Sequence, residues 1–151
     1  MLSDLPFTLS SLKDAYARGT RPTDVIDEIF ARLEAVNDPG IFIHLRDRDS
    51  LRAEAAAGAF KGISQVDSAA AAYGRRQVYL SATNGFSGGY VRSDRMISAV
   101  AIAGVGAGME RDHCGESRIF GADLPDPEEI GRIAAERTLA RVGAVSYTHL
   151  T

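Results

Sequence analysis

The feature that most constrains this 151-residue chain is a hairpin signal at Asn84-Gly85. Residues 77–82 before it alternate between polar and apolar side chains, and a longer extended run follows from about Gly89 to Ala103. Asn-Gly is the preferred pair for a two-residue type I′ turn, because both central residues need a positive φ angle. The sequence therefore predicts two antiparallel strands joined by a tight turn at residues 84–85.

The second of these strands has apolar or small side chains on both faces. One face would carry Met96, Ser98, Val100 and Ile102, and the other Ile97, Ala99, Ala101 and Ala103. Such a strand is typical of the centre of a sheet. A third strand is expected from Glu110 to Phe120, and a final helix from Asp126 to Arg141.

The N-terminal third is predicted to be helical. Thr8 can cap a first helix that Gly19 ends, and Pro22 begins a second with an apolar stripe through Val36. Residues 41–44 form a short strand candidate, and Ser50 is expected to cap a third helix from Leu51 to about Phe60. The fold class is thus α+β, with N-terminal helices, an antiparallel sheet and a closing C-terminal helix.

Composition limits the possible functions. Formal charge is −3 and no basic cluster occurs, which argues against nucleic acid as a partner. The longest uncharged stretch, Met96 to Met109, is too short to span a bilayer, and residues 1–4 lack the features of a signal peptide. A single cysteine, Cys114, cannot form an internal disulfide and favours a cytoplasmic location.

Charge and glycine are distributed unevenly along the chain. Residues 1–55 contain seven Lys/Arg and ten Asp/Glu, whereas the remainder contains ten of each. Thirteen of the fifteen glycines follow residue 55. We therefore expect a helical part at residues 1–55 and an α+β domain at residues 56–144.

Several residues have side chains suited to chemistry, but none forms a complete motif. Residues 104–108 follow a strand and are glycine-rich, yet Met109 stands where a dinucleotide-binding loop needs glycine, so a strand connection is the better interpretation. Glu110 and Asp112 would share one strand face, either as paired carboxylates for a metal or acid/base role or, more commonly, as solvated charges.

Metal ligation and nucleophilic catalysis are also disfavoured. On a strand, His113 would point to one face and Cys114 and Glu116 to the other, unless Gly115 makes a bulge. His44 is interpreted as a packing residue, and Ser87 lacks the glycine spacing of a nucleophile elbow. We therefore expect no catalytic residue, metal ligand or cofactor site within this chain.

Residues 55–144 resemble the TldD/PmbA family. The similarity is carried by the segments 61–64, 84–90, 109–112, 123–131 and 136–141, and it is closer to the PmbA branch. The resemblance implies an N-terminal domain of a cytoplasmic two-protein assembly that degrades or matures peptides. It also implies that zinc is bound only by a TldD-type partner.

Two other segments are interpreted differently. Residues 9–16, 22–25, 31–34 and 38–44 resemble the opening helices of amidase-signature enzymes of the allophanate hydrolase type. Those enzymes use a Ser-Ser-Lys triad, and neither Lys13 nor Lys61 lies near a Gly/Ser-rich loop of that kind. Residues 145–151 resemble neither family and are interpreted as a non-native tail.

Three functional hypotheses follow. The preferred one is a non-catalytic domain of a TldD/PmbA-type peptide-processing assembly, which contacts a peptide and either a metal-bearing TldD-type subunit or a second copy. The second is a truncated amidase that acts on a small urea-derived amide, and the third is a junction of two unrelated fragments without a joint function. Under the first, the candidate residues for binding a peptide or partner are Gly88, Gly89, Tyr90, Arg92 and Arg111.

Overall fold

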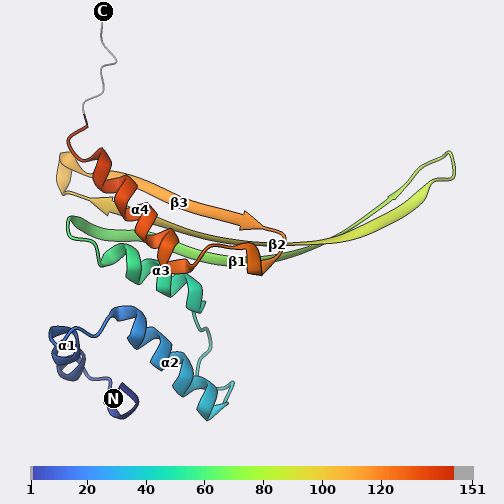
Figure 1. Cartoon of the computed structure of the whole chain (residues 1–151). Coiled ribbons are helices and arrows are strands. Elements are labelled where there is room, and N and C mark those ends of the chain that lie inside the picture. The colour runs from blue at the N-terminus through green and yellow to red at the C-terminus, as the bar shows by residue number, and fades with distance from the viewer. Residues whose placement is uncertain (1, 145–151) are drawn as a thin grey trace, which may run out of the picture.

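The computed structural model describes residues 2–144, so the predicted tail at 145–151 lies outside the described residues. Figure 1 shows the arrangement of helices and strands. In chain order the elements are α1 (Leu9–Ala17), α2 (Pro22–Val36), α3 (Arg48–Gly58), β1 (Ile63–Ser81), β2 (Ser87–Ala103), β3 (Glu110–Arg118) and α4 (Pro127–Arg141). Short 3-10 turns occur at Leu2–Asp4, Gly106–Gly108 and Gly121–Asp123. The predicted α+β class, with a helix after the sheet, is confirmed.

The three strands form one antiparallel sheet in the order β1-β2-β3. β2 is central, as its two apolar faces predicted. Helices α3 and α4 pack against the sheet and against each other, while α2 packs mainly on α3. Figure 1 accordingly shows α1 and α2 on the far side of α3 from the sheet.

The core consists mostly of small side chains. It combines two alanines of α3, part of β2, Cys114 of β3 and the inner face of α4. Its members are Ala53, Ala57, Ile97, Ala99, Ala101, Cys114, Ile130 and Ala134, all of them buried. Small residues let the backbones approach closely, and a methyl group added at Gly131 of α4 would lie 2.1 Å from the Ala53 carbonyl oxygen.

Helix ends follow the sequence signals in three of four cases. Thr8 caps α1, Pro22 is the first residue of α2, and Asp126 caps α4. The predicted start of the third helix was wrong, because the Asp47 carboxylate rather than Ser50 forms the N-cap and accepts a hydrogen bond from the Ser50 N–H at 3.0 Å. That helix runs over Arg48–Gly58 and stops before Phe60.

The predicted short strand at residues 41–44 was also wrong. This segment forms no strand, and Ile43 and His44 are exposed, so His44 is not a packing residue. Apolar residues alone do not make a strand, since a strand needs a partner for its backbone hydrogen bonds. Within the described residues, neither edge of the sheet pairs with residues 41–44.

Strand β1 is much longer than expected. The sequence indicated a strand only from residue 77, whereas β1 begins at Ile63 and pairs with β2 over its whole length. β3 ends at the pair Arg95–Arg118, so beyond that pair β1 and β2 pair only with each other. We call this two-stranded extension, residues 74–94, the arm; Figure 1 shows it projecting away from the helices.

The turn at the tip of the arm is a hairpin, as predicted, but it is not the predicted two-residue type. The Ala82 N–H donates to the Phe86 carbonyl at 2.9 Å, and the Gly85 N–H donates to the Ala82 carbonyl at 3.1 Å. The loop therefore has three residues, 83–85. Only Gly85, with φ +87°, is left-handed; Asn84 is not. A three-residue loop that ends in a left-handed glycine is the next most common hairpin connection.

Replacing Gly85 with Val should destabilise the tip of the arm by about 1–2 kcal/mol, because a β-branched residue is strained at positive φ. Amide hydrogen exchange should show faster exchange in residues 79–90 and unchanged exchange in the core. Gly108→Val is the control, since Gly108 is not left-handed and an added Cβ meets nothing within 4 Å. Unchanged exchange at the tip of the Gly85 variant would contradict this prediction.

The apolar stripe of α2 is only partly covered, because α2 packs on α3 and not on the sheet. Val25 is its one buried apolar residue, and Ile26 lines an open cleft of about 390 Å³ between α2, α3 and β1. The predicted boundary between residues 55 and 56 falls inside α3, and the division into two parts stays a prediction. No helix within residues 2–144 is long and apolar enough to cross a membrane.

Candidate functional site

The sheet has one face against the helices and one open face. Ile97, Ala99 and Ala101 of β2 are buried beneath α3 and α4. The alternating residues Met96, Ser98 and Val100 point the other way. Met96 is 38% exposed. The open face is therefore the sheet surface that the described helices leave free for a partner.

Four of the five candidate residues lie on this open face. The register places Gly88 opposite Leu80, Tyr90 opposite Val78 and Arg92 opposite Arg76, all on the arm. Arg111 is on the same face of β3, opposite Ile102, and pairs with Asp67 at 3.7 Å. Ile102, the partner of Arg111, lies ten residues from Arg92 along β2, which is roughly 33 Å. The structure therefore brings Tyr90 and Arg92 together and leaves Arg111 at the other end of the sheet.

Gly89 lies on the opposite face of the arm, paired with Tyr79. A Cβ at Gly89 would lie 2.5 Å from the Val78 carbonyl oxygen and 3.1 Å from the Tyr79 ring. The missing side chain thus lets the Tyr79 ring and the β1 backbone approach β2 closely. Gly89 therefore contributes nothing to the open face.

Sequence reasoning missed Arg76, which faces Arg92 directly across the two strands. Both side chains are exposed. Together with Tyr90, Asp94 and Ser117 they line a depression of about 320 Å³ where β3 ends and the arm begins. Counting back from the hairpin turn could have found Arg76, but only with the correct loop length.

Glu110 and Asp112 do share one strand face, and both pair with Arg141 near the end of α4. Their oxygens lie 3.8 and 3.1 Å from the Arg141 guanidinium. The pKa of Asp112 is lowered by a hydrogen bond from the His113 N–H and by Arg141. A carboxylate held ionised in this way is poorly suited to act as an acid, and these pairs attach α4 to β3.

The His113, Cys114 and Glu116 side chains divide between the two faces as the strand period predicted. His113 is 75% exposed on the open face, whereas Cys114 is buried in the core, where burial raises the pKa of its thiol. Within residues 2–144, no three His, Cys, Asp or Glu side chains lie close enough to share a metal ion. The described residues therefore do not fit a zinc site.

With this geometry established, comparison with known proteins identifies the chain's relatives. The sequence model of the PmbA/TldA metallopeptidase central domain matches residues 43–142, more than half of the chain. The chain belongs to the PmbA/TldD family. No curated protein matches it in sequence.

Among solved structures, the following one has a similar fold. It is a Thermotoga maritima protein provisionally described as a modulator of a DNA gyrase, with a TM-score of 0.58 and 22% identity. The match covers 65% of this chain and 22% of that protein, so the chain spans about a fifth of its relative. At this identity the similarity concerns the fold alone.

The family match refines two expectations. The resemblance implied an N-terminal domain, whereas the matching model describes the central domain of PmbA/TldD proteins. The amidase-like interpretation of residues 1–55 gains no support, and residues 43–55 of that stretch fall inside the PmbA/TldD match.

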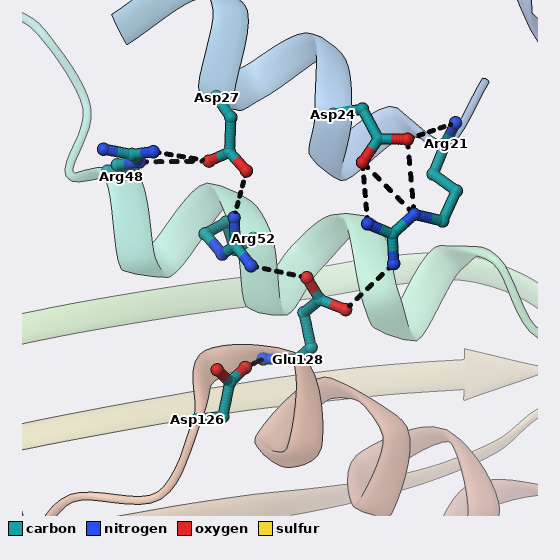
Figure 2. Close-up of polar contacts among 7 residues, drawn as sticks. All are labelled: Arg21, Asp24, Asp27, Arg48, Arg52, Asp126 and Glu128. Atoms are coloured by element: carbon teal, nitrogen blue, oxygen red, sulfur yellow. Dashed lines mark hydrogen bonds and ion pairs between the residues drawn. The ribbon is translucent and has the colours of Figure 1, made fainter. Parts of the chain in front are cut away.

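A chain of ion pairs joins α2 to the PmbA/TldD domain, as Figure 2 shows. Asp27 of α2 accepts hydrogen bonds from Arg48 and Arg52 of α3, the first at 2.8 Å. Arg52 also reaches Glu128 of α4 at 2.6 Å, and Arg21 lies 3.7 Å from the same carboxylate. Arg52 is only 20% exposed. Helix α2, which lies outside the family match, is thus linked to it by polar contacts around one partly buried arginine.

The contacts of Asp27 predict how the stability of the fold changes at acid pH. The Arg52 hydrogen bond lowers the pKa of Asp27 below its ordinary value of 3.8. A lowered folded-state pKa stabilises the fold above about pH 4, and this stabilisation is lost as pH falls through the folded value. Because the Asp27 side chain is 36% exposed, the gain should stay below about 1 kcal/mol.

Urea titrations from pH 6 down to acid test this prediction. The stability difference between wild type and Asp27→Asn should shrink as the pH falls below about 4. Asp14→Asn is the control, because Asp14 is an exposed carboxylate of α1. Parallel stability curves for wild type and Asp27→Asn across this range would refute the assignment.

Proposed function

We propose that this chain supplies the non-catalytic central domain of a TldD/PmbA-type metallopeptidase assembly, and that its open sheet face and arm contact an extended peptide or a related subunit. The observation that carries the proposal is the family match over residues 43–142. The catalytic zinc would come from a metal-bearing TldD-type subunit. A cytoplasmic location and a role in peptide processing belong to the same proposal.

The sheet edges support a role in peptide contact. In the described residues, β1 has no strand on its outer side, and β2 has none on the β3 side from Ser87 to Asp94. Unpaired backbone N–H and C=O groups can accept an extended peptide as an added strand. Tyr90 and Arg92 lie along the second of these edges, which places side-chain contacts beside the backbone positions a peptide would use.

Reconstitution tests the proposal. The full chain would be mixed with a zinc-bearing TldD-type protein, and cleavage of a fluorogenic unstructured peptide followed with and without chelator. We expect no cleavage by the chain alone, and faster, chelator-sensitive cleavage by the mixture than by the zinc protein alone. Chelator-resistant cleavage by the chain alone, or no effect of the chain on the zinc protein, would refute the proposal.

A pair of tyrosine variants connects this assay to the open face. Tyr90→Ala should reduce the stimulation, because Tyr90 lies on the open face and is 60% exposed. Tyr79→Ala is the matched control, with a tyrosine that is 69% exposed on the opposite face of the same arm. Equal effects of the two variants would show that the open face has no special role.

A further inference from the structure

The Arg76–Arg92 pair is an unusual feature of the arm. The two residues are direct cross-strand partners, and like charges in that position repel each other. In the described part of the chain, no carboxylate forms an ion pair with either guanidinium. Residues 75–93 contain three arginines and no acidic residue, although the whole chain has a charge of −3. The arm thus carries positive charge at Arg76 and Arg92 that no ion pair within the described residues neutralises.

The surroundings of the pair form a recess. Arg76, Arg92 and Tyr90 share the depression of about 320 Å³ with Ser117, whose hydroxyl lies at the end of β3. Asp94, the acidic residue in the lining of the recess, lies over Gly74, where an added Cβ would be 2.9 Å from its Oδ2. Because Gly74 of β1 has no side chain, it leaves space for the Asp94 carboxylate of β2.

The recess adjoins the unpaired edge of β2. β3 ends opposite Arg95, and β2 continues for residues 87–94 without a neighbour on that side among the described residues. A peptide that extended the line of β3 along this edge would pass beside Arg92. Its backbone could pair with β2 while one of its acidic groups reached the two guanidiniums.

We propose that Arg76 and Arg92 bind a carboxylate of an extended peptide added along residues 87–94 of β2. The inference rests on the proposed function and names the substrate chemistry that this surface prefers. Arginine guanidiniums bind carboxylates through paired hydrogen bonds, and an anion between them removes the repulsion of the like charges. Asp94, which also lines the recess, disfavours a doubly charged phosphate or a nucleic acid more than a singly charged carboxylate.

Peptide binding to the full chain without metal tests this inference. The probes are one fluorescein-labelled Ser/Thr/Val peptide with a free C-terminal carboxylate, its C-terminal amide, and the amide with one internal Glu. Fluorescence anisotropy should show at least one carboxylate form binding about tenfold more tightly than the neutral amide, as expected for hydrogen bonds between charged groups. The form that binds best identifies whether the carboxylate is terminal or on a side chain.

Three substitutions assign the preference to the recess. Arg76→Gln and Arg92→Gln should each abolish it, whereas Arg75→Gln should preserve it, because Arg75 is exposed on the opposite face of the arm. Circular dichroism checks that each variant folds. The comparison of carboxylate and amide peptides uses the wild-type chain, so it tests the inference even if a variant fails to fold.

Several results would overturn the inference. These are equal binding of all three peptides by the wild-type chain, an equal loss in all three variants, or tighter Arg76-dependent binding of inorganic phosphate or a single-stranded DNA oligonucleotide. Failure here is distinguishable from failure of the proposed function. Stimulated cleavage without carboxylate preference refutes only the inference, and carboxylate preference without stimulated cleavage refutes only the proposed function.

Discussion

Replacing Gly131 with Ala should lower the free energy of unfolding by about 3 kcal/mol, the upper end of the usual cost of overpacking a core. A Cβ at this position would lie 2.1 Å from the Ala53 carbonyl oxygen and 2.9 Å from the Ala57 nitrogen. Both obstacles belong to the α3 backbone, so no flexible side chain can move aside. α3 and α4 would have to separate, and the small-residue core around them would loosen.

Urea unfolding of the full chain measures this effect. Gly108→Ala is the matched control, because a Cβ there meets nothing within 4 Å, and it should change stability by less than about 0.5 kcal/mol. Equal unfolding midpoints for Gly131→Ala and wild type would show that the two helices pack less closely than described.

Replacing Ile97 with Ala should cost about 3 kcal/mol, within the range for truncating a buried isoleucine. Ile97 is 2% exposed and is the largest side chain that β2 contributes to the core. Neighbouring side chains are mostly alanines, which are too short to fill the space that it would leave.

Met96→Ala is the control for this second substitution. Met96 is adjacent in sequence but lies on the open face and is 38% exposed, so its truncation should cost less than about 1 kcal/mol. The same unfolding experiment compares the two variants. Equal losses would mean that the open face is covered and that the two faces of β2 are not as different as described.

Local sequence signals were sufficient to predict most helices and the hairpin, but not the first half of β1. Residues 63–76 contain four consecutive alanines, a glycine and two arginines, a composition without strand preference. They form a strand because β2 is already extended beside them and supplies the pairing. Residues 41–44 show the converse, since they have suitable side chains but no strand to pair with.

The type of turn decided whether the arginine pair could be predicted. A two-residue loop at Asn84-Gly85 would pair residue 83 with residue 86 and place Gln77 opposite Arg92. The observed three-residue loop shifts the register by one and places Arg76 there instead. A shift of one residue moves every side chain to the other face, so a site across two strands needs the loop length to be known. Tyr90 and Arg92 could be named as candidates from the sequence because they lie on a single strand.

The two ends of the long strands β1 and β2 have different roles. Near the helices, the inward-facing residues of β2 are buried against α3 and α4, and substitution there is constrained by folding. Beyond Arg95, the same strands only have to keep their ladder of backbone hydrogen bonds, which depends little on side-chain identity. Evolution could therefore change what the arm recognises without altering the domain that holds it, because the demands of folding and of recognition fall on different ends of the same strands.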